Sequence, residues 1–145
     1  VVRTYISDKS FFDFNNILAR IQNELFDMGA DLATPENSKY SNNILRITNL
    51  QVTRLENEID KYNRNLNELK SFVLPGGSDL ASWFHFARTT ARRAERRITR
   101  LASEEDININ ILLYINRLSD LLFVLARCSN NNGETDVLWQ PGKSR

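Results

Sequence analysis

The stretch Ser71–Arg100, SFVLPGGSDLASWFHFARTTARRAERRITR, decides how this 145-residue chain is interpreted. It begins with Leu-Pro-Gly-Gly, in which Pro and Gly stand in the order that a type II turn prefers. Ser78 follows as a good N-cap, and Asp79 puts a negative charge at the positive end of a helix dipole. We therefore expect a helix from Ser78 to about Ser103.

The apolar residues of this helix share one arc of a helical wheel at about 100° per residue and predict the face that enters a core. They are Leu80, Phe84, Ala87, Ala91, Ala94, Ile98 and Leu101. Six arginines lie between positions 88 and 100, with one glutamate among them. An inner stripe borders the core face and consists of His85, Arg88, Arg92, Glu95 and Thr99; an outer row, Arg93, Arg97 and Arg100, faces away.

The arginines allow three interpretations. A run of charge is usually a solvated surface. Alternatively, an arginine that is partly desolvated beside a core can hold a phosphate through paired hydrogen bonds, which predicts an anion site on the inner stripe. Clustered arginine is also the electrostatic footprint of a nucleic-acid-binding helix. Against this third interpretation, the aromatic residues are not interleaved with the arginines, and the net charge of the chain is only +1.

Three further helices are predicted from apolar residues that recur in steps of three and four. They span about Phe11–Thr34, Asn42–Ser71 and Glu104–Cys128. Residues 1–10 are expected to be loop or extended, and Val137–Trp139 to start a short terminal element. Long helices with short connections favour a single all-α domain over residues 1–145, an up-down bundle of four long helices plus the terminal element.

Polar residues on the last helix add a second candidate feature. Asn116, Asp120 and Arg127 share a stripe that lies nearly opposite the apolar line of that helix. We therefore expect this stripe to face solvent or another subunit. His85 is the only histidine and Cys128 the only cysteine, so the sequence predicts no histidine-based metal site, no internal disulfide and no serine-histidine-aspartate triad. No apolar run reaches the roughly 18 residues of a membrane span.

Three ordered motifs resemble those of the PduO-type ATP:cob(I)alamin adenosyltransferases. The first, LFDMGADLATP, covers residues 25–35. The second combines FVLPGG (72–77), LAS (80–82), His85, ART (87–89) and RRAER (92–96). The third is YINRLSD (114–120) followed by LFVLAR (122–127). The resemblance runs from about Asn15 to Trp139.

This resemblance implies a ferritin-like, cobalamin adenosyltransferase-like bundle that assembles as a homotrimer with ATP between subunits. It implies transfer of the 5′-deoxyadenosyl group of ATP to the cobalt of cob(I)alamin, with release of triphosphate and with Mg²⁺ accompanying ATP. Arg88 and Arg92 would stabilise the leaving group, and Glu95 would orient them without binding metal. Asn116 and Asp120 match nucleotide-contact and corrin-side positions. Phe72 would pack below the corrin and displace its lower axial ligand.

The chain departs from the family pattern in two places. The family opens with a Gly- and Thr-rich segment that wraps the triphosphate, and nothing before Phe11 resembles it, so we expect this segment to be missing. Phe12 replaces the Asp that would pair with Arg88 across subunits. An impaired or non-catalytic relative that trimerises and binds corrinoid is therefore the alternative function. A cobalamin reductase or an adenosylcobalamin-dependent enzyme is a possible partner, nucleic acid and membrane are not expected, and the location would be cytoplasmic, or the mitochondrial matrix in a eukaryote.

Overall fold

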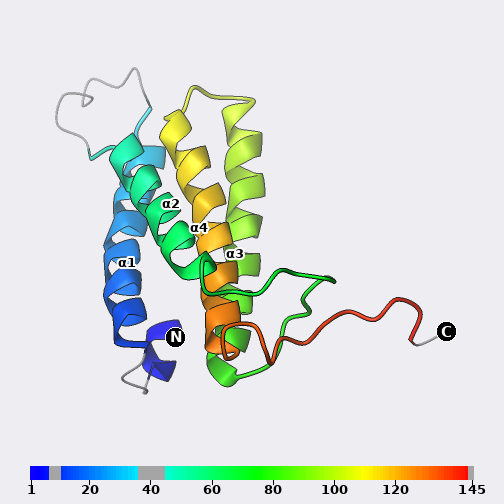
Figure 1. The fold of residues 1–145 in the computed structure, drawn as a ribbon. Helices are drawn as coiled ribbons and strands as arrows, with labels where there is room; N and C mark the ends of the chain where they lie inside the picture. The colour runs from blue at the N-terminus through cyan, green and yellow to red at the C-terminus, as the bar shows by residue number, and fades with distance from the viewer. Residues whose placement is uncertain (7–10, 36–44, 144–145) are drawn as a thin grey trace.

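The computed structural model describes residues 1–6, 11–35 and 45–143. Within these residues the chain forms four α-helices and no β-strand: α1 (Phe12–Leu32), α2 (Asn49–Asn63), α3 (Asp79–Ala102) and α4 (Ile109–Ser129). Figure 1 shows them running alternately up and down, side by side, with α4 between α2 and α3. The predicted all-α, up-down bundle is therefore confirmed.

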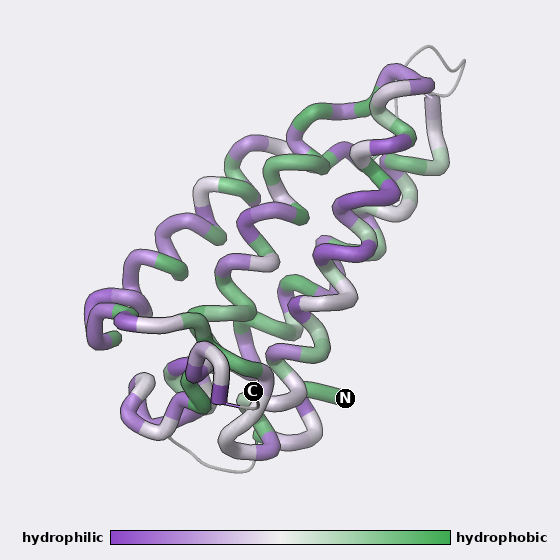
Figure 2. Tube along the Cα trace, turned by 90° about the vertical axis from the view of Figure 1, so that its right-hand side faces the viewer, coloured by the Kyte–Doolittle hydropathy of each residue, from purple (hydrophilic) through white to green (hydrophobic). Residues whose placement is uncertain are grey.

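The bundle is held together by one apolar face on each helix. Along the helices of the tube in Figure 2, hydrophobic and hydrophilic segments alternate, as expected of helices with one face in a core. Leu55 of α2, Phe84 of α3, and Ile111, Leu121 and Leu125 of α4 are completely buried. The predicted core face of α3 is confirmed, since Leu80, Phe84, Ala91 and Ile98 are buried, and Ala87, Ala94 and Leu101 are half-buried.

Taken by itself, α4 is long and apolar enough to cross a membrane. Most of that helix is buried inside the bundle, however, and the core helix of a bundle has the same length and composition. Its polar residues Asn116, Arg117 and Asp120 contact one another or α3. The features of α4 are therefore those of the central helix of this core.

The predicted range of the second helix, Asn42–Ser71, was too long at both ends. Residues 36–44 lie outside the described residues, 45–48 are not helical, and α2 begins only at Asn49. Thr48 and Gln51 form a capping box there, which satisfies backbone donors at the helix start. At the other end, the backbone carbonyl of Asn67 accepts a hydrogen bond from Arg127 of α4 (2.9 Å), so the chain leaves the helix before the apolar periodicity ends.

The predicted start of the fourth helix at Glu104 was also wrong. α4 begins at Ile109, and the Asn108 side chain caps it by accepting a hydrogen bond from Asn110 N (3.1 Å). Glu104 instead pairs with Arg100 at the end of α3 (3.3 Å). The acidic residues therefore belong to the α3–α4 connection, and an asparagine that the sequence did not single out sets the start of α4.

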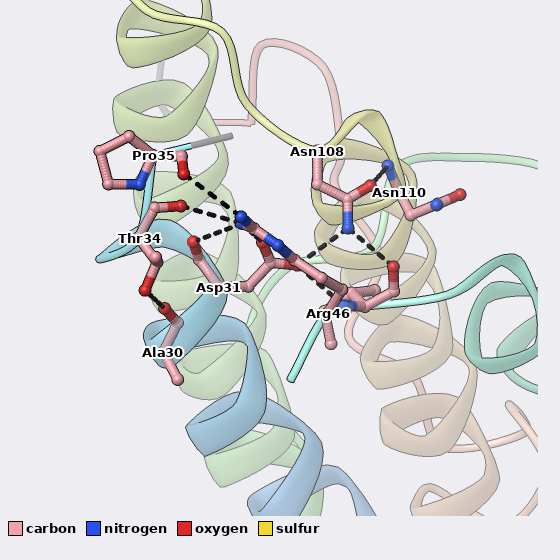
Figure 3. Close-up of polar contacts among 8 residues, drawn as sticks. Ala30, Asp31, Thr34, Pro35, Arg46, Asn108 and Asn110 are labelled. Carbon is pink, nitrogen blue, oxygen red and sulfur yellow. Dashed lines mark hydrogen bonds and ion pairs between the residues drawn. The ribbon is translucent and has the colours of Figure 1, made fainter. Parts of the chain in front are cut away.

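A buried carboxylate joins three segments at this end of the bundle (Figure 3). Asp31, near the end of α1, accepts hydrogen bonds from Arg46 Nη1 (2.5 Å), Ile47 N (2.8 Å) and Asn108 Nδ2 (2.8 Å). The Asn108 amide also donates to Ile47 O (2.7 Å). One aspartate thus ties the end of α1 to the start of α2 and to the cap of α4. We call Asp31, Arg46 and Asn108 the Asp31 cluster.

Of residues 1–10, predicted as loop or extended, Val2–Tyr5 instead form a 3₁₀ turn, and residues 7–10 lie outside the described part of the chain. Its first turn is closed by Thr4, whose backbone N–H and hydroxyl both donate to Val1 O. The Tyr5 ring packs on Trp83 of α3, with centroids 5.4 Å apart. The packing of Tyr5 against a helix that is distant in the sequence explains this turn, which the sequence of the N-terminal residues did not predict.

Candidate functional site

A row of polar side chains joins α3 to α4 along one face of the bundle. Glu95 of α3 accepts a hydrogen bond from Asn116 Nδ2 of α4 (2.8 Å) and forms an ion pair with Arg92 (3.5 Å). The Asn116 carbonyl accepts from Arg117 Nη2 (2.6 Å), and Arg117 also pairs with Asp120 (3.3 Å). Four of the predicted site residues, which the sequence places on two separate helices, are therefore connected through one hydrogen-bonded row.

Arg88 continues this row toward the start of α3 through an aromatic contact. Its guanidinium carbon lies 5.3 Å from the centre of the Phe123 ring, within cation–π distance. His85 meets the same ring at 6.2 Å, edge to face. Among the described residues, Arg88 has no carboxylate within ion-pair distance, although it is half-buried. Its guanidinium therefore has N–H donors to offer an anionic ligand.

His85 is buried, and burial lowers its pKa below the ordinary value of 6.5, with the charge of Arg88 lowering it further. The imidazole is therefore neutral at pH 7 and does not add to the positive charge beside Arg88. Its Nε2 is buried without a hydrogen-bond partner among the described residues. This arrangement fits a packing role under Phe123 better than that of a metal ligand or a catalytic base.

The row suits an anion for two reasons. It brings together three arginines, Arg88, Arg92 and Arg117, but only two carboxylates, Glu95 and Asp120, so a positive charge remains. Each carboxylate already contacts an arginine, which fixes the guanidinium that it touches. Guanidinium groups held in this way form directional, charge-assisted hydrogen bonds to phosphate. The ion pair of Glu95 with Arg92 is compatible with the orienting role predicted for Glu95.

The predicted division of the arginines into two populations is only partly reflected in their exposure. Arg93 and Arg97 are exposed, and Arg100 pairs with Glu104 near the end of the helix. Arg88 is half-buried as expected, but 45% of the Arg92 side chain remains accessible. Contact with Glu95, rather than burial, therefore distinguishes Arg92 from the outer row.

The expectation that Arg127 faces solvent or another subunit is wrong. Arg127 is only 5% exposed, donates to Asp136 Oδ2 through Nε (2.8 Å), and donates to Asn67 O through Nη2 (2.9 Å). Residues after α4 and before α3 fold over this end of the helix, so a position opposite the apolar line is covered by the chain's own loops. Asn116 and Asp120 remain partly accessible.

Phe72 lies apart from the row, in the connection that precedes α3. Its side chain is 76% exposed and meets Trp139 edge to face, with ring centroids 5.8 Å apart. Val73 and Leu138 form an antiparallel bridge, so the expected terminal element exists as a short pairing partner of the Phe72 segment. The turn between Phe72 and α3 differs from the type II prediction, because the positive φ falls at Gly77 (97°) and not at Gly76.

The structure gives little support for a metal site or for a reactive cysteine. In the part of the chain that the structure describes, no group of three His, Cys, Asp or Glu residues could hold a metal ion. Cys128 is buried, and burial raises its pKa to about 11, so the thiol does not supply a thiolate at neutral pH. The side chain of Phe12, predicted to replace a partner of Arg88, lies outside the described part of the structure.

A cavity of about 410 Å³ lies elsewhere, between α1 and α3. Its lining is mostly apolar and includes Leu18, Met28, Trp83 and Phe86. Its charged group, Arg3, is already bonded to Asn15 and Gln22. With this apolar lining, and with its charged side chain already bonded, the cavity is unsuited to a highly charged anion.

Arg117 is the site residue that sequence analysis missed. The signal was its position three residues before Asp120, the spacing at which opposite charges meet on a helix. The sequence indicates Phe123 less clearly as a site residue. Phe123 contacts both Arg88 and His85, but only the packing of α3 on α4 brings the three side chains together.

Comparisons with known proteins agree with the fold and with the motifs. The sequence model of the cobalamin adenosyltransferase family matches residues 1–129, and so includes the first 14 residues, for which the motifs indicated no resemblance. A corrinoid adenosyltransferase of Mycobacterium tuberculosis is 50% identical over 134 residues, covering 90% of this chain and 67% of that protein. The Bacillus subtilis corrinoid adenosyltransferase is 46% identical over 132 residues, covering 90% and 66%.

A solved structure agrees as well. It is a variant of the PduO-type ATP:corrinoid adenosyltransferase from Lactobacillus reuteri, complexed with cobalamin and ATP. It superimposes with a TM-score of 0.86 at 39% identity, over 96% of this chain and 76% of that one. The chain spans about two thirds of the length of the curated relatives that it matches. With motifs, fold and sequence in agreement, this chain belongs to the cobalamin adenosyltransferase family.

Proposed function

We propose that this protein transfers the 5′-deoxyadenosyl group of ATP to the cobalt of cob(I)alamin and releases triphosphate. The observation that carries the proposal is the row between α3 and α4, which consists of Arg88, Arg92, Glu95, Asn116, Arg117 and Asp120. It is a partly accessible site with excess positive charge in a member of a family whose relatives are corrinoid adenosyltransferases.

The chemistry explains why the site contains arginines and no general base. Co(I) supplies the electron pair that forms the Co–C5′ bond, and the C5′–O bond breaks with its electrons leaving on triphosphate, so cobalt becomes Co(III). No proton moves in this step, and the protein need not supply a base. It must align C5′ with cobalt and stabilise the negative charge on the leaving oxygen. Arg88 and Arg92 perform the second task in this proposal.

The remaining residues would position the two substrates. Asn116, held by Glu95 and Arg117, would contact the nucleotide, and Asp120, paired with Arg117, would face the corrin side. Phe72 would press on the lower face of the corrin and displace its axial ligand, which makes cobalt easier to reduce to Co(I). The large exposure of its ring supports this assignment, because an aromatic surface available to a flat apolar ligand is otherwise costly in water.

Mg²⁺ would enter with the nucleotide, since Mg²⁺ is usually held by substrate phosphates with one or two carboxylates. Glu95 and Asp120 are already paired with arginines, and the described residues offer no metal cluster.

We further propose a homotrimer in which a second subunit completes the ATP site beside Arg88. The bacterial relatives support a cytoplasmic location, with a cobalamin reductase or an adenosylcobalamin-dependent enzyme as possible partners.

The decisive experiment incubates the protein with ATP, Mg²⁺ and chemically reduced cobalamin and follows the corrin absorbance spectrum. Conversion of the Co(I) spectrum to that of adenosylcobalamin, with triphosphate formed in equal amount, is the expected result. Corrinoid binding without conversion would contradict the enzymatic proposal and favour the impaired relative. Replacement of ATP by its β,γ-methylene analogue is a useful control, since transfer leaves the triphosphate chain intact and should continue.

Nucleic-acid binding is tested separately. Arginine-rich surfaces that bind DNA by counterion release lose affinity steeply with salt. With a net charge of +1, we expect no retention on a DNA column at physiological ionic strength. Salt-sensitive retention under those conditions would instead assign the outer arginine row a nucleic-acid partner.

A further inference from the structure

Three polar side chains are almost completely buried where α4 ends. Arg127 is 5% exposed, Asn130 is 1% exposed, and the Asp136 side chain is equally enclosed. Asp136 accepts hydrogen bonds from Arg127 Nε through one carboxylate oxygen (2.8 Å) and from Asn130 Nδ2 through the other (3.1 Å). We call these residues the Asp136 cluster; neither the reaction nor the substrates proposed above require it.

The cluster holds the chain on both sides of Phe72. Upstream, Arg127 Nη2 donates to Asn67 O (2.9 Å). Downstream, Asn130 Nδ2 donates to Gly76 O (3.1 Å), and its carbonyl accepts from Ser78 N (2.9 Å). Asn67 and Gly76 bracket Phe72, so both anchors of this connection attach to one buried group.

Two glycines show how closely the backbone approaches the cluster. Gly77 has φ +97°, and a Cβ there would lie 2.2 Å from Asn130 Oδ1. Gly133 has φ +91°, and its Cβ would lie 2.7 Å from Arg127 Nη2. At either position a residue with a side chain would have to adopt a backbone conformation that L-residues avoid, and its Cβ would also clash with an atom of the cluster. The backbone therefore fits the cluster only because both positions are glycine.

The segment after Asp136 continues the connection to Phe72 directly. Leu74 N donates to Val137 O (2.7 Å), and Trp139 N donates to Phe72 O (2.8 Å). The Ser71 hydroxyl donates to Trp139 O (2.7 Å). We call this short ladder the Phe72 clamp. It leaves the Phe72 ring exposed while both neighbours of the ring along the chain are fixed.

From this arrangement we propose that the Asp136 cluster and the Phe72 clamp are a positioning device, which holds the Phe72 ring rigid at the corrin side before cobalamin binds. A buried ion pair is weak evidence for stability, because desolvation of both charges offsets their attraction. Its more informative property is geometric: it specifies one arrangement of the loops that it joins. An aromatic ring that must displace an axial ligand loses less entropy on binding if it is already immobilised.

The proposal rests on the function proposed above for Phe72, and it makes Asp136 a positioning residue without any contact to substrate. Loosening the clamp should weaken the step that depends on Phe72, which is removal of the lower axial ligand from cob(II)alamin. It should leave ATP binding by the row between α3 and α4 unchanged. Cob(I)alamin has already lost that ligand, so chemically reduced substrate should bypass the defect.

The first experiment compares Asp136→Asn with Asp31→Asn. Both aspartates are buried and paired with an arginine, but Asp31 lies at the end of α1 and Asp136 just after α4, and these helices end at opposite ends of the bundle (Figure 1). In Asp136→Asn, with ATP bound, the four-coordinate cob(II)alamin signal should fall about tenfold and the KM for cob(II)alamin rise about tenfold, at an unchanged KM for ATP. Asp31→Asn should leave both cobalamin quantities within about twofold of the wild type.

A second pair keeps the proposal testable if Asp136→Asn does not fold. Trp139→Pro removes the N–H that donates to Phe72 O as well as the ring, whereas Trp139→Ala removes the ring alone. The proposal expects the cob(II)alamin defect to be several times larger in the proline variant. Equal defects in both would overturn the clamp, as would an Asp136→Asn protein with the same cobalamin profile as Asp31→Asn.

Amide hydrogen exchange separates this inference from the proposed function. Without any substrate, exchange at Leu74 and Trp139 should be about tenfold faster in Asp136→Asn than in the wild type, and unchanged in Asp31→Asn. If Asp136→Asn exchanges faster but the wild type has no transferase activity, the clamp stands and the reaction is rejected. If exchange is unchanged and the wild type is active, the positioning device is rejected and the reaction stands.

Discussion

Arg88 and Arg92 lie one helical turn apart on α3 but have different surroundings. Arg88 is half-buried against Phe123 and has no carboxylate partner among the described residues, whereas Arg92 is more exposed and contacts Glu95. In the proposed function the two arginines would have complementary tasks: Arg88 would offer donors without a carboxylate partner to the ligand, and Arg92 would offer donors oriented by its contact with Glu95. Substitutions at single residues can test this.

Arg92→Ala should reduce kcat by at least about 10²-fold, because in the proposed reaction the lost group would stabilise the charge that develops on the leaving triphosphate. Helicity by circular dichroism and oligomer size by light scattering should not change, since the side chain makes one ion pair near the surface. Arg97→Ala, an exposed arginine of the outer row, is the matched control and should retain wild-type turnover. Survival of turnover in Arg92→Ala would show that the inner stripe is assigned wrongly.

His85 predicts a pH effect on stability, and because it is the only histidine the effect can be isolated. Burial lowers its pKa in the folded state below 6.5, so the unfolded chain binds more protons as the pH falls through 6.5. Stability should therefore be complete above that value and decrease toward pH 5, by no more than about 1.4 kcal/mol per pH unit. Thermal melting of wild type and His85→Gln at pH 7.5, 6.5 and 5.5 tests this; parallel curves would contradict it.

At the scale of elements, the start of α3 is set by a cap that also serves tertiary structure. The Ser78 hydroxyl accepts from Ala81 N (3.1 Å), as an N-cap should, and donates to Ser129 O at the end of α4 (2.9 Å). Its backbone N–H reaches Asn130. The first turn of α3 is thus joined to the last turn of α4, which fixes the register in which Glu95 meets Asn116.

Two glycine substitutions of the same kind should have opposite effects on the free energy of unfolding. Gly29 lies in α1, where a Cβ would meet no neighbouring atom within 4 Å, so Gly29→Ala should stabilise the protein by about 0.5–1 kcal/mol through lower backbone entropy of the unfolded chain. Gly77→Ala should destabilise it by at least about 2 kcal/mol, because it combines positive φ with contact to Asn130. Urea denaturation measures both, and a neutral Gly77→Ala would contradict the close approach.

At the scale of the whole molecule, the bundle has a buried aspartate at each end. The Asp31 cluster joins α1, the segment before α2 and the start of α4, and the Asp136 cluster joins the end of α4 to the connection before α3. Between them, the row that crosses from α3 to α4 is partly accessible on the outside of the subunit. A site of this kind is well placed to be completed by a neighbouring subunit.

We therefore expect the protein to be a trimer in solution, with a mass three times the 16.8 kDa of the chain. Light scattering coupled to size-exclusion chromatography measures this. If a second subunit completes the ATP site, turnover per chain should fall when dilution dissociates the trimer, while helicity stays constant. A fully active monomer would contradict the proposal that ATP lies between subunits.

The sequence by itself determined the helical class, the extent of α1 and α3, and the apolar face that α3 turns to the core. These predictions rest on local features of the sequence, namely the apolar periodicity, the Ser78 cap and the Asp79 charge. They hold in the structure because helix packing and helix capping favour the same helix boundaries. The sequence motifs also identified the family, because the order and spacing of the motif residues can be read directly from the sequence.

Tertiary structure decided what depends on distant partners. α2 ends early because Arg127, 60 residues later in the chain, binds the Asn67 carbonyl, and α4 starts late because Asn108 is held by Asp31. Arg127 is buried by loops whose paths periodicity does not encode, so its wheel position gave the wrong environment. Buried polar groups must be satisfied, and a one-dimensional pattern does not contain the identity of a partner that folding brings within about 3 Å.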